Sequence, residues 1–219
     1  MNAKHVLCGM AMVLGSSVAT QAAIIPVTVP NGNFQTTSGA GGGGGWFELG
    51  VWSTTSASLF RTQTSYDGLT GTNGTRMVNM GLDSVWQTLS VPAVANSTYT
   101  LTLDMGRPNN NAGGTFKAML YDGARFASMI INTPTTNGPA FQATPNWLSY
   151  TFTGTTGATV SGNNITLEID GISGGQGGAA NWLDNVSLSY VVIPEPGTFG
   201  LLAMSAVGLL AGRRRQRSN

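Results

Sequence analysis

Thr98-Tyr99-Thr100-Leu101-Thr102-Leu103-Asp104-Met105 is the stretch of sequence that decides the fold. Its apolar side chains occupy every second position, and the positions between them are polar. Successive side chains of a β-strand point to opposite faces, so this period of two puts the tyrosine, the two leucines and the methionine on one face. The segment therefore predicts a strand that covers a core on one side and meets water on the other.

The same period recurs between residues 24 and 193. It is clearest at 148–152, 165–169 and 186–190. Further candidate strands are 46–52, 58–61, 75–80, 85–91, 115–121 and 125–131. Turn-forming residues separate them, and no stretch of this region has a helical period. About ten short strands joined by turns predict an all-β fold, a jelly-roll β-sandwich.

Charge and composition exclude several classes of function. Region 24–193 holds five basic and eight acidic residues, a net charge of −3, although the whole chain is formally +1. Nucleic-acid binding needs clustered lysine and arginine, so we expect no nucleic-acid partner. The single histidine and the single cysteine, His5 and Cys8, precede this region. It therefore has neither a Ser–His–Asp triad nor a zinc site with histidine or cysteine ligands.

The chain begins with the features of a secretory signal peptide. Lys4 supplies a positive charge, residues 6–18 are apolar, and small residues precede a cleavage site after Ala22 or Ala23. A first transmembrane helix is the alternative, but the apolar run is short and ends in small residues. We expect residues 1–23 to be a signal peptide that the secretion machinery recognises.

Three different segments follow one another near residue 219. Pro194-Glu195-Pro196 ends any strand or helix, because proline fixes φ and lacks an N–H donor. An uncharged apolar run occupies 199–211, and Arg213-Arg214-Arg215-Gln216-Arg217 follows it. The run is shorter than the roughly 20 residues of a stable spanning helix, and arginines favour the cytoplasmic side of a bilayer. We expect a short hydrophobic helix that associates with a membrane transiently.

These segments resemble a PEP-CTERM sorting signal, the bacterial tag read by the membrane peptidase exosortase. Pro194, Glu195 and Pro196 match the tripeptide of that family, and the arginines from Arg213 onward match its basic end. The resemblance implies exosortase as a partner, cleavage near the tripeptide, and delivery to the cell surface or extracellular matrix of a Gram-negative bacterium. An ordinary C-terminal anchor is the alternative. The expected domains are a signal peptide at 1–23, a jelly roll at 24–192 and a sorting signal at 193–219.

A second resemblance covers most of residues 30–190. Short motifs around Asn33-Phe34, Trp86, Trp147 and Trp182-Leu183-Asp184 are similar to galactose-binding-like jelly rolls, which include carbohydrate-binding modules. Many such modules hold a structural calcium ion near the first and last strands. The resemblance implies Asp184 as a calcium ligand and Asn33 near it. The alternative for Asp184 is a strand-start residue that bonds its own backbone.

Aromatic side chains on the predicted wet faces are the candidates for glycan binding. Trp147, Trp86 and Tyr121 each alternate with apolar residues of their strands, and a sugar ring packs well on an aromatic face. Packing in the core or at the ends of the sandwich is the alternative for each of them.

Two carboxylates leave an enzymatic alternative open. Glu168 and Asp170 lie two positions apart on one strand face, roughly 6.6 Å along the backbone at about 3.3 Å per residue. Glycoside hydrolysis needs two carboxylates, although a solvated strand face has the same pattern. The sequence therefore predicts a non-catalytic protein of the extracellular polysaccharide matrix, glycan-binding or structural. The alternative is a polysaccharide-acting hydrolase or lyase.

Overall fold

The computed structural model describes residues 22–35, 38–40, 47–48, 51–55, 61–63, 65–66, 68–72, 76–108, 114–140, 145–173 and 181–193. Every regular element within these ranges is a β-strand. No helix among them is long and apolar enough to cross a bilayer. The predicted signal peptide, apart from Ala22 and Ala23, and the sorting segment from Pro194 onward lie outside the described residues.

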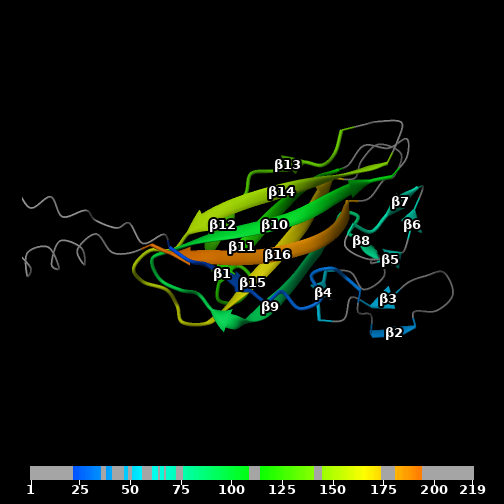
Figure 1. Ribbon diagram of the computed structural model, residues 1–219. Helices are drawn as coiled ribbons and strands as arrows, with labels where there is room; N and C mark the ends of the chain where they lie inside the picture. Colours follow the sequence, from blue (N-terminus) through cyan, green and yellow to red (C-terminus); the bar gives the residue numbers. More distant parts are fainter. Residues whose placement is uncertain are drawn as a thin grey trace, which may run out of the picture.

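One of the two main sheets is built around β10 and β16, and we call it the β10–β16 sheet (Figure 1). Its strands are antiparallel and follow the order β14-β10-β16-β8-β5. Strand β1 pairs with the last part of β16, whereas β8 pairs with its first two residues. The bounds are Ile24–Val27 (β1), Arg61–Gln63 (β5), Met77–Asn79 (β8), Ser97–Arg107 (β10), Asn146–Thr155 (β14) and Trp182–Val192 (β16).

The other main sheet, the β11–β15 sheet, packs against the first one. Its antiparallel order is β12-β11-β15-β9-β4, and β13 also pairs with β11. The bounds are Ser53–Thr54 (β4), Ser84–Pro92 (β9), Thr115–Asp122 (β11), Ser128–Asn132 (β12), Thr136–Asn137 (β13) and Asn164–Ser173 (β15). Two small hairpins join β2 (Ser38–Ala40) to β3 (Phe47–Glu48) and β6 (Ser65–Tyr66) to β7 (Leu69–Thr70).

The core lies between the two sheets, and its side chains follow the period of two. The predicted apolar positions of β10 are buried, and so are the corresponding positions of β11 and β15. Full burial of such a side chain stabilises the fold by about 1.5–3 kcal/mol. The buried side chains of these three strands include Tyr99, Leu101, Leu103, Met105, Phe116, Leu120, Ile165, Leu167 and Ile169. The predicted all-β jelly-roll sandwich is confirmed.

Several local predictions were wrong. Leu148 was expected in the core but is 43% exposed, because β14 is an edge strand and Leu148 lies near its start. The strand predicted at 125–131 begins only at Ser128, since residues 124–127 form a turn closed by a hydrogen bond from Ala127 N to Ala124 O. In the predicted strand 46–52, Val51 lies in a turn, and β4 starts beyond it at Ser53.

Candidate functional site

Aromatic and charged residues gather on the outer face of the β11–β15 sheet. Trp86 of β9 lies directly across from Glu168 of β15, and Tyr121 of β11 pairs with Thr166, two residues before Glu168. All three side chains alternate with core residues of their strands and point away from the core. The alternation of the sequence predicts both aromatics on wet faces, and the sheet brings them together on its outer side. Trp86 is half-buried there, but Tyr121 is only 1% exposed, because Glu168, Arg125 and Phe126 surround it.

Glu168 is the centre of this group, although its side chain is almost fully buried. Tyr121 Oη donates a hydrogen bond to Glu168 Oε2 at 2.9 Å, and Arg125 Nε donates one to Oε1 at 2.9 Å. Arg125 Nη2 also binds Oε1 and completes an ion pair. A buried carboxylate is costly unless donors and an opposite charge surround it, so these contacts explain how Glu168 can be 1% exposed.

The guanidinium of Arg125 also stacks on two aromatic rings. Its Cζ lies 4.1 Å from the ring centroid of Trp86 and 4.4 Å from that of Phe126. The rings of Tyr121 and Phe126 meet edge to face, with centroids 6.2 Å apart. Cation–π contacts of this kind contribute about 0.5–1 kcal/mol at exposed sites and more when desolvated. We call Trp86, Tyr121, Arg125, Phe126 and Glu168 the aromatic platform.

The turn between β11 and β12 holds the exposed edge of the platform. Phe126 has a φ of 71°, a left-handed conformation that costs a side chain other than glycine about 1–2 kcal/mol. Its ring is nevertheless 72% exposed, so burial of the ring does not offset the strain. An exposed aromatic held in a strained turn is the type of feature that marks functional surfaces.

The electrostatics of the platform fix its charge state at neutral pH. Burial, followed by the hydrogen bond to Glu168, raises the pKa of Tyr121 well above its usual value. The hydrogen bond to Glu168 likewise raises the pKa of Arg125. Tyr121 is therefore a neutral donor, and the positive charge of Arg125 offsets the negative charge of Glu168. The platform is electrically neutral overall.

Trp147 lies on the outer face of the other sheet. Its Nε1 donates to Thr70 O at 2.7 Å, and its ring packs with Leu69, Met77 and Trp182 under the β6–β7 hairpin. Gly106 allows this packing, because a Cβ there would lie 2.7 Å from the Trp147 ring. These are the contacts of a packing residue. A role of Trp147 in ligand binding stays a prediction.

Asp184 accepts hydrogen bonds at the point where β16 bulges. Its Oδ2 receives Thr72 N at 2.7 Å and Thr72 Oγ1 at 3.0 Å, and its Oδ1 receives Asn185 N at 2.7 Å. Asn185 has a φ of 51°, and the register between β10 and β16 shifts there. The bulge thus aims Asp184 at the loop that follows β7.

The two predicted calcium ligands accept hydrogen bonds in two separate places, and the calcium role of each stays a prediction. The oxygens of Asp184 face N–H and O–H donors, whereas Asn33 Oδ1 receives Gln35 N at 3.4 Å in a separate turn. Calcium needs six to eight oxygen ligands. Across the part of the chain that the structure describes, no group of three acidic, histidine or cysteine side chains could hold a metal.

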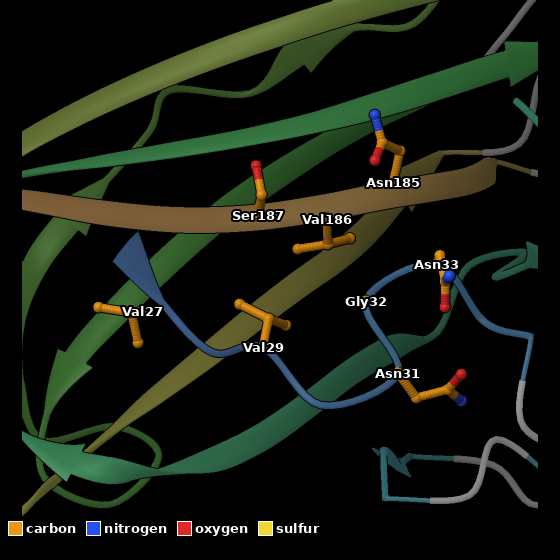
Figure 2. A pocket seen from close by; sticks show the side chains of 8 residues that line it. All are labelled: Val27, Val29, Asn31, Gly32, Asn33, Asn185, Val186 and Ser187. Atoms are coloured by element: carbon orange, nitrogen blue, oxygen red, sulfur yellow. The ribbon is translucent and has the colours of Figure 1, made fainter. Parts of the chain in front are cut away.

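Asn33 does line a shallow pocket beside β16 (Figure 2). The pocket has a volume of about 340 Å³ and lies between the turn that follows β1 and the bulged part of β16. Its walls are Val27, Val29, Asn31, Gly32, Asn33, Asn185, Val186 and Ser187. Asp184 is not among them, so the two predicted calcium ligands do not share this space.

The second carboxylate of the enzymatic alternative has a different environment from the first. Asp170 shares the outer face with Glu168 and accepts a hydrogen bond from Ser84 Oγ at 2.7 Å. Glu168 instead forms the ion pair with Arg125. The two carboxylates are therefore held by separate partners.

Arg125 and Phe126 are the site residues that the sequence reading missed. The reading assigned both to a strand, in which alternation would have put them on opposite faces. The turn residues Asp122-Gly123 that precede them were the available signal, because a turn can direct successive side chains over one face.

Comparisons with known proteins agree with these parts of the molecule. Residues 192–215 match the PEP-CTERM protein-sorting motif. No curated protein matches the chain.

Solved structures of similar fold include two cyclases and a carbohydrate-binding module. A Stig cyclase, Fisc from Fischerella sp. TAU, has a TM-score of 0.56 at 14% identity over 77% of this chain and 98% of that chain. Another crystal structure of a cyclase from that source, with a bound indolyl butanone, has a TM-score of 0.52 at 15% identity over 78% and 100%. A carbohydrate-binding module named CBM4 scores 0.45 at 14% identity over 74% and 99%.

At identities of 14–15%, the likeness to these solved structures shows the fold alone. The sorting motif is a separate finding, because it starts where the last strand ends. The chain thus carries a PEP-CTERM protein-sorting motif at residues 192–215, attached to an all-β jelly-roll body.

Proposed function

We propose that this chain is an exported protein, sorted to the surface of a Gram-negative bacterium, whose jelly roll binds polysaccharide of the extracellular matrix without catalysis. The PEP-CTERM motif supports sorting through exosortase and a transient stay in the membrane. The jelly-roll body supports a binding role, since extracellular sandwiches of this kind present broad sheet faces to ligands.

The aromatic platform is the observation that carries the glycan-binding proposal. Trp86 is half-buried and Phe126 is exposed, and both belong to one open sheet face. The C–H face of a sugar packs on such rings, while Arg125 and the hydroxyl of the exposed Thr88 can bond its hydroxyl groups. Because Arg125 and Glu168 offset each other's charge, the platform favours a neutral polysaccharide over an acidic one.

Binding of the purified protein to a panel of neutral and acidic polysaccharides, including that of the source organism, tests the proposal. We expect Trp86→Ala and Phe126→Ala to weaken binding at least tenfold, which corresponds to about 1.4 kcal/mol. Trp147→Ala tests the alternative site on the opposite face, and we expect it to keep the affinity although it loosens the packing under the β6–β7 hairpin. Loss of binding in Trp147→Ala, with unchanged binding in Trp86→Ala, would contradict a site on this face.

Product analysis of the same incubations separates binding from catalysis. We expect no release of reducing or unsaturated sugar ends from any bound polysaccharide. Turnover that Glu168→Gln or Asp170→Asn abolishes would instead establish the hydrolase or lyase alternative.

A further inference from the structure

The first and last strands of the body meet at one end of the sandwich. Ile24 of β1 pairs with Val191 of β16, and Val192 pairs with Ser97 of β10 (Figure 1). The pairing continues one residue further, because Ile193 N donates to Asn96 O at 2.6 Å. The backbone pairing therefore reaches the residue before the Pro-Glu-Pro tripeptide, and we call this end of the body the terminal tip.

The terminal tip exposes several large aliphatic side chains to solvent. Ile24, Ile25, Val192 and Ile193 are between 38% and 72% exposed. They lie at one end of two paired strands, where Ile24 pairs with Val191 and Ile25 with Tyr190. Successive side chains of a strand alternate, so these aliphatics are exposed on both faces of the sheet at this end. Neighbouring exposed aliphatics, unlike scattered ones, mark a surface that meets an apolar partner.

The sequence that follows Ile193 indicates that a lipid bilayer is the apolar partner within reach of the terminal tip. Only five residues, 194–198, separate Ile193 from the apolar run 199–211. Six fully extended steps at about 3.5 Å per residue span roughly 20 Å at most. When the apolar run is in a bilayer, the terminal tip is therefore within reach of the headgroup region, which is several ångströms deep on each side of the hydrocarbon.

We propose that the terminal tip is a membrane-contact surface, which seats Ile24, Ile25, Val192 and Ile193 in the lipid interface while the sorting segment is inserted. The inference rests on the proposed sorting route. The body then stands end-on to the membrane, with β16 pointing into it and both sheet faces directed sideways. This orientation presents the strand end next to Pro194 at the membrane surface, where a membrane peptidase would meet it.

Fluorescence quenching by spin-labelled lipids tests this orientation on the full chain. Cys8 is the only cysteine of the sequence. In a Cys8→Ser variant, a fluorescent label can therefore be attached to one cysteine introduced at a chosen position. We choose Ile25→Cys at the terminal tip and Leu82→Cys as the matched control. Leu82 is also exposed, but it follows β8, which pairs with Trp182 at the start of β16. Ile25 pairs with Tyr190, eight residues further along β16, which is roughly 26 Å away at about 3.3 Å per residue.

In vesicles of phosphatidylethanolamine and phosphatidylglycerol, we expect severalfold stronger quenching at position 25 than at position 82. Ile24→Ser combined with Val192→Ser should reduce quenching at position 25 while the chain stays bound to the vesicles. Equal quenching of the labels at positions 25 and 82 would overturn the proposal. A change in the quenching at position 25 that appears only when exosortase is added would also overturn it, because the terminal tip would then contact the peptidase and not the lipid. A chain that does not float with vesicles at all would refute membrane anchoring, and with it both this inference and the sorting route.

Discussion

Tyr121 combines a hydrogen bond to a buried carboxylate with an aromatic contact in one side chain. Its ring covers Glu168 from solvent and meets Phe126 edge to face, while its hydroxyl donates to the buried carboxylate. Phenylalanine would keep the ring contacts but remove the donor. The neutral form of the phenol is therefore the one that the fold requires.

This requirement predicts a loss of stability in alkali. The pKa of Tyr121 is raised in the folded state by burial and by Glu168, so its contribution is complete below the unfolded value of 10.0 and is lost as the pH rises above it. Tyr121→Phe should flatten this decline in denaturant unfolding measured from neutral pH to beyond pH 10. Tyr150→Phe is a control at a half-buried tyrosine, whose pKa burial also raises but whose hydroxyl donates to the carbonyl of Asn137 and not to a carboxylate. An alkaline decline that is unchanged in Tyr121→Phe would mean that other groups cause it.

At the scale of elements, the β6–β7 hairpin depends on two kinds of contact with the β10–β16 sheet. Leu69 packs with Trp182, Met77 and the half-buried Trp147, and the following loop bonds to Asp184 through Thr72. The hairpin itself has only two residues in each strand. Isolated hairpins are marginal in water, so these contacts with the sheet must hold it in place.

Asp184→Ala should loosen this hairpin. Removal of the carboxylate leaves the amides of Thr72 and Asn185 without this acceptor. Thr72 is exposed and Asn185 half-buried, so we expect a cost of about 0.5–1.5 kcal/mol for each lost hydrogen bond. We expect a lower free energy of unfolding, and faster hydrogen exchange at Leu69 and Thr72 than in the rest of the molecule. Thr102→Ala, which removes an exposed hydroxyl from the same face, should stay within about 0.5 kcal/mol. Uniform exchange changes in Asp184→Ala would show that the hairpin does not depend on it.

Asn181 links three other elements through a single side chain. Its Nδ2 donates to Gly81 O, Thr115 O and Ser173 O at 3.0–3.3 Å, which joins the β8–β9 turn to β11 and β15. The side chain is fully buried, so its two N–H groups are shared among these three carbonyls away from water.

For the whole molecule, the sorting motif directly after the last strand predicts where the chain is processed and delivered. Replacement of Pro194, Glu195 and Pro196 by alanine should keep the chain in the membrane fraction at full length, while the unchanged chain becomes shorter and reaches the cell surface. Cell fractionation with an antibody against the body measures both outcomes. Lys117→Ala, a substitution on a strand of the body, should be sorted normally. Normal processing of the alanine variant, or of any variant in cells without exosortase, would contradict the sorting route.

Much of the fold could be predicted because alternation is a local property. The period of two in residues 98–105 is sufficient to assign the buried face of β10, and the same reading placed Trp86 and Tyr121 on outer faces. Local alternation cannot tell an edge strand from a central one, and this is why Leu148 was expected in the core. It also cannot recognise a bulge, which depends on the partner strand.

The sequence by itself determined the all-β class, the absence of histidine and cysteine chemistry from the body, and the sorting motif, because each of these depends on residue types and their spacing. Only the tertiary structure decided which aromatics share a face, because that depends on the order of strands in the two sheets. It placed Trp86 beside Arg125 and Glu168, and it put Trp147 on the opposite side under a hairpin. It also placed Asp184 as an acceptor for Thr72 and Asn185, since the bulge at Asn185 aims the carboxylate at backbone donors, while its role as a metal ligand stays a prediction.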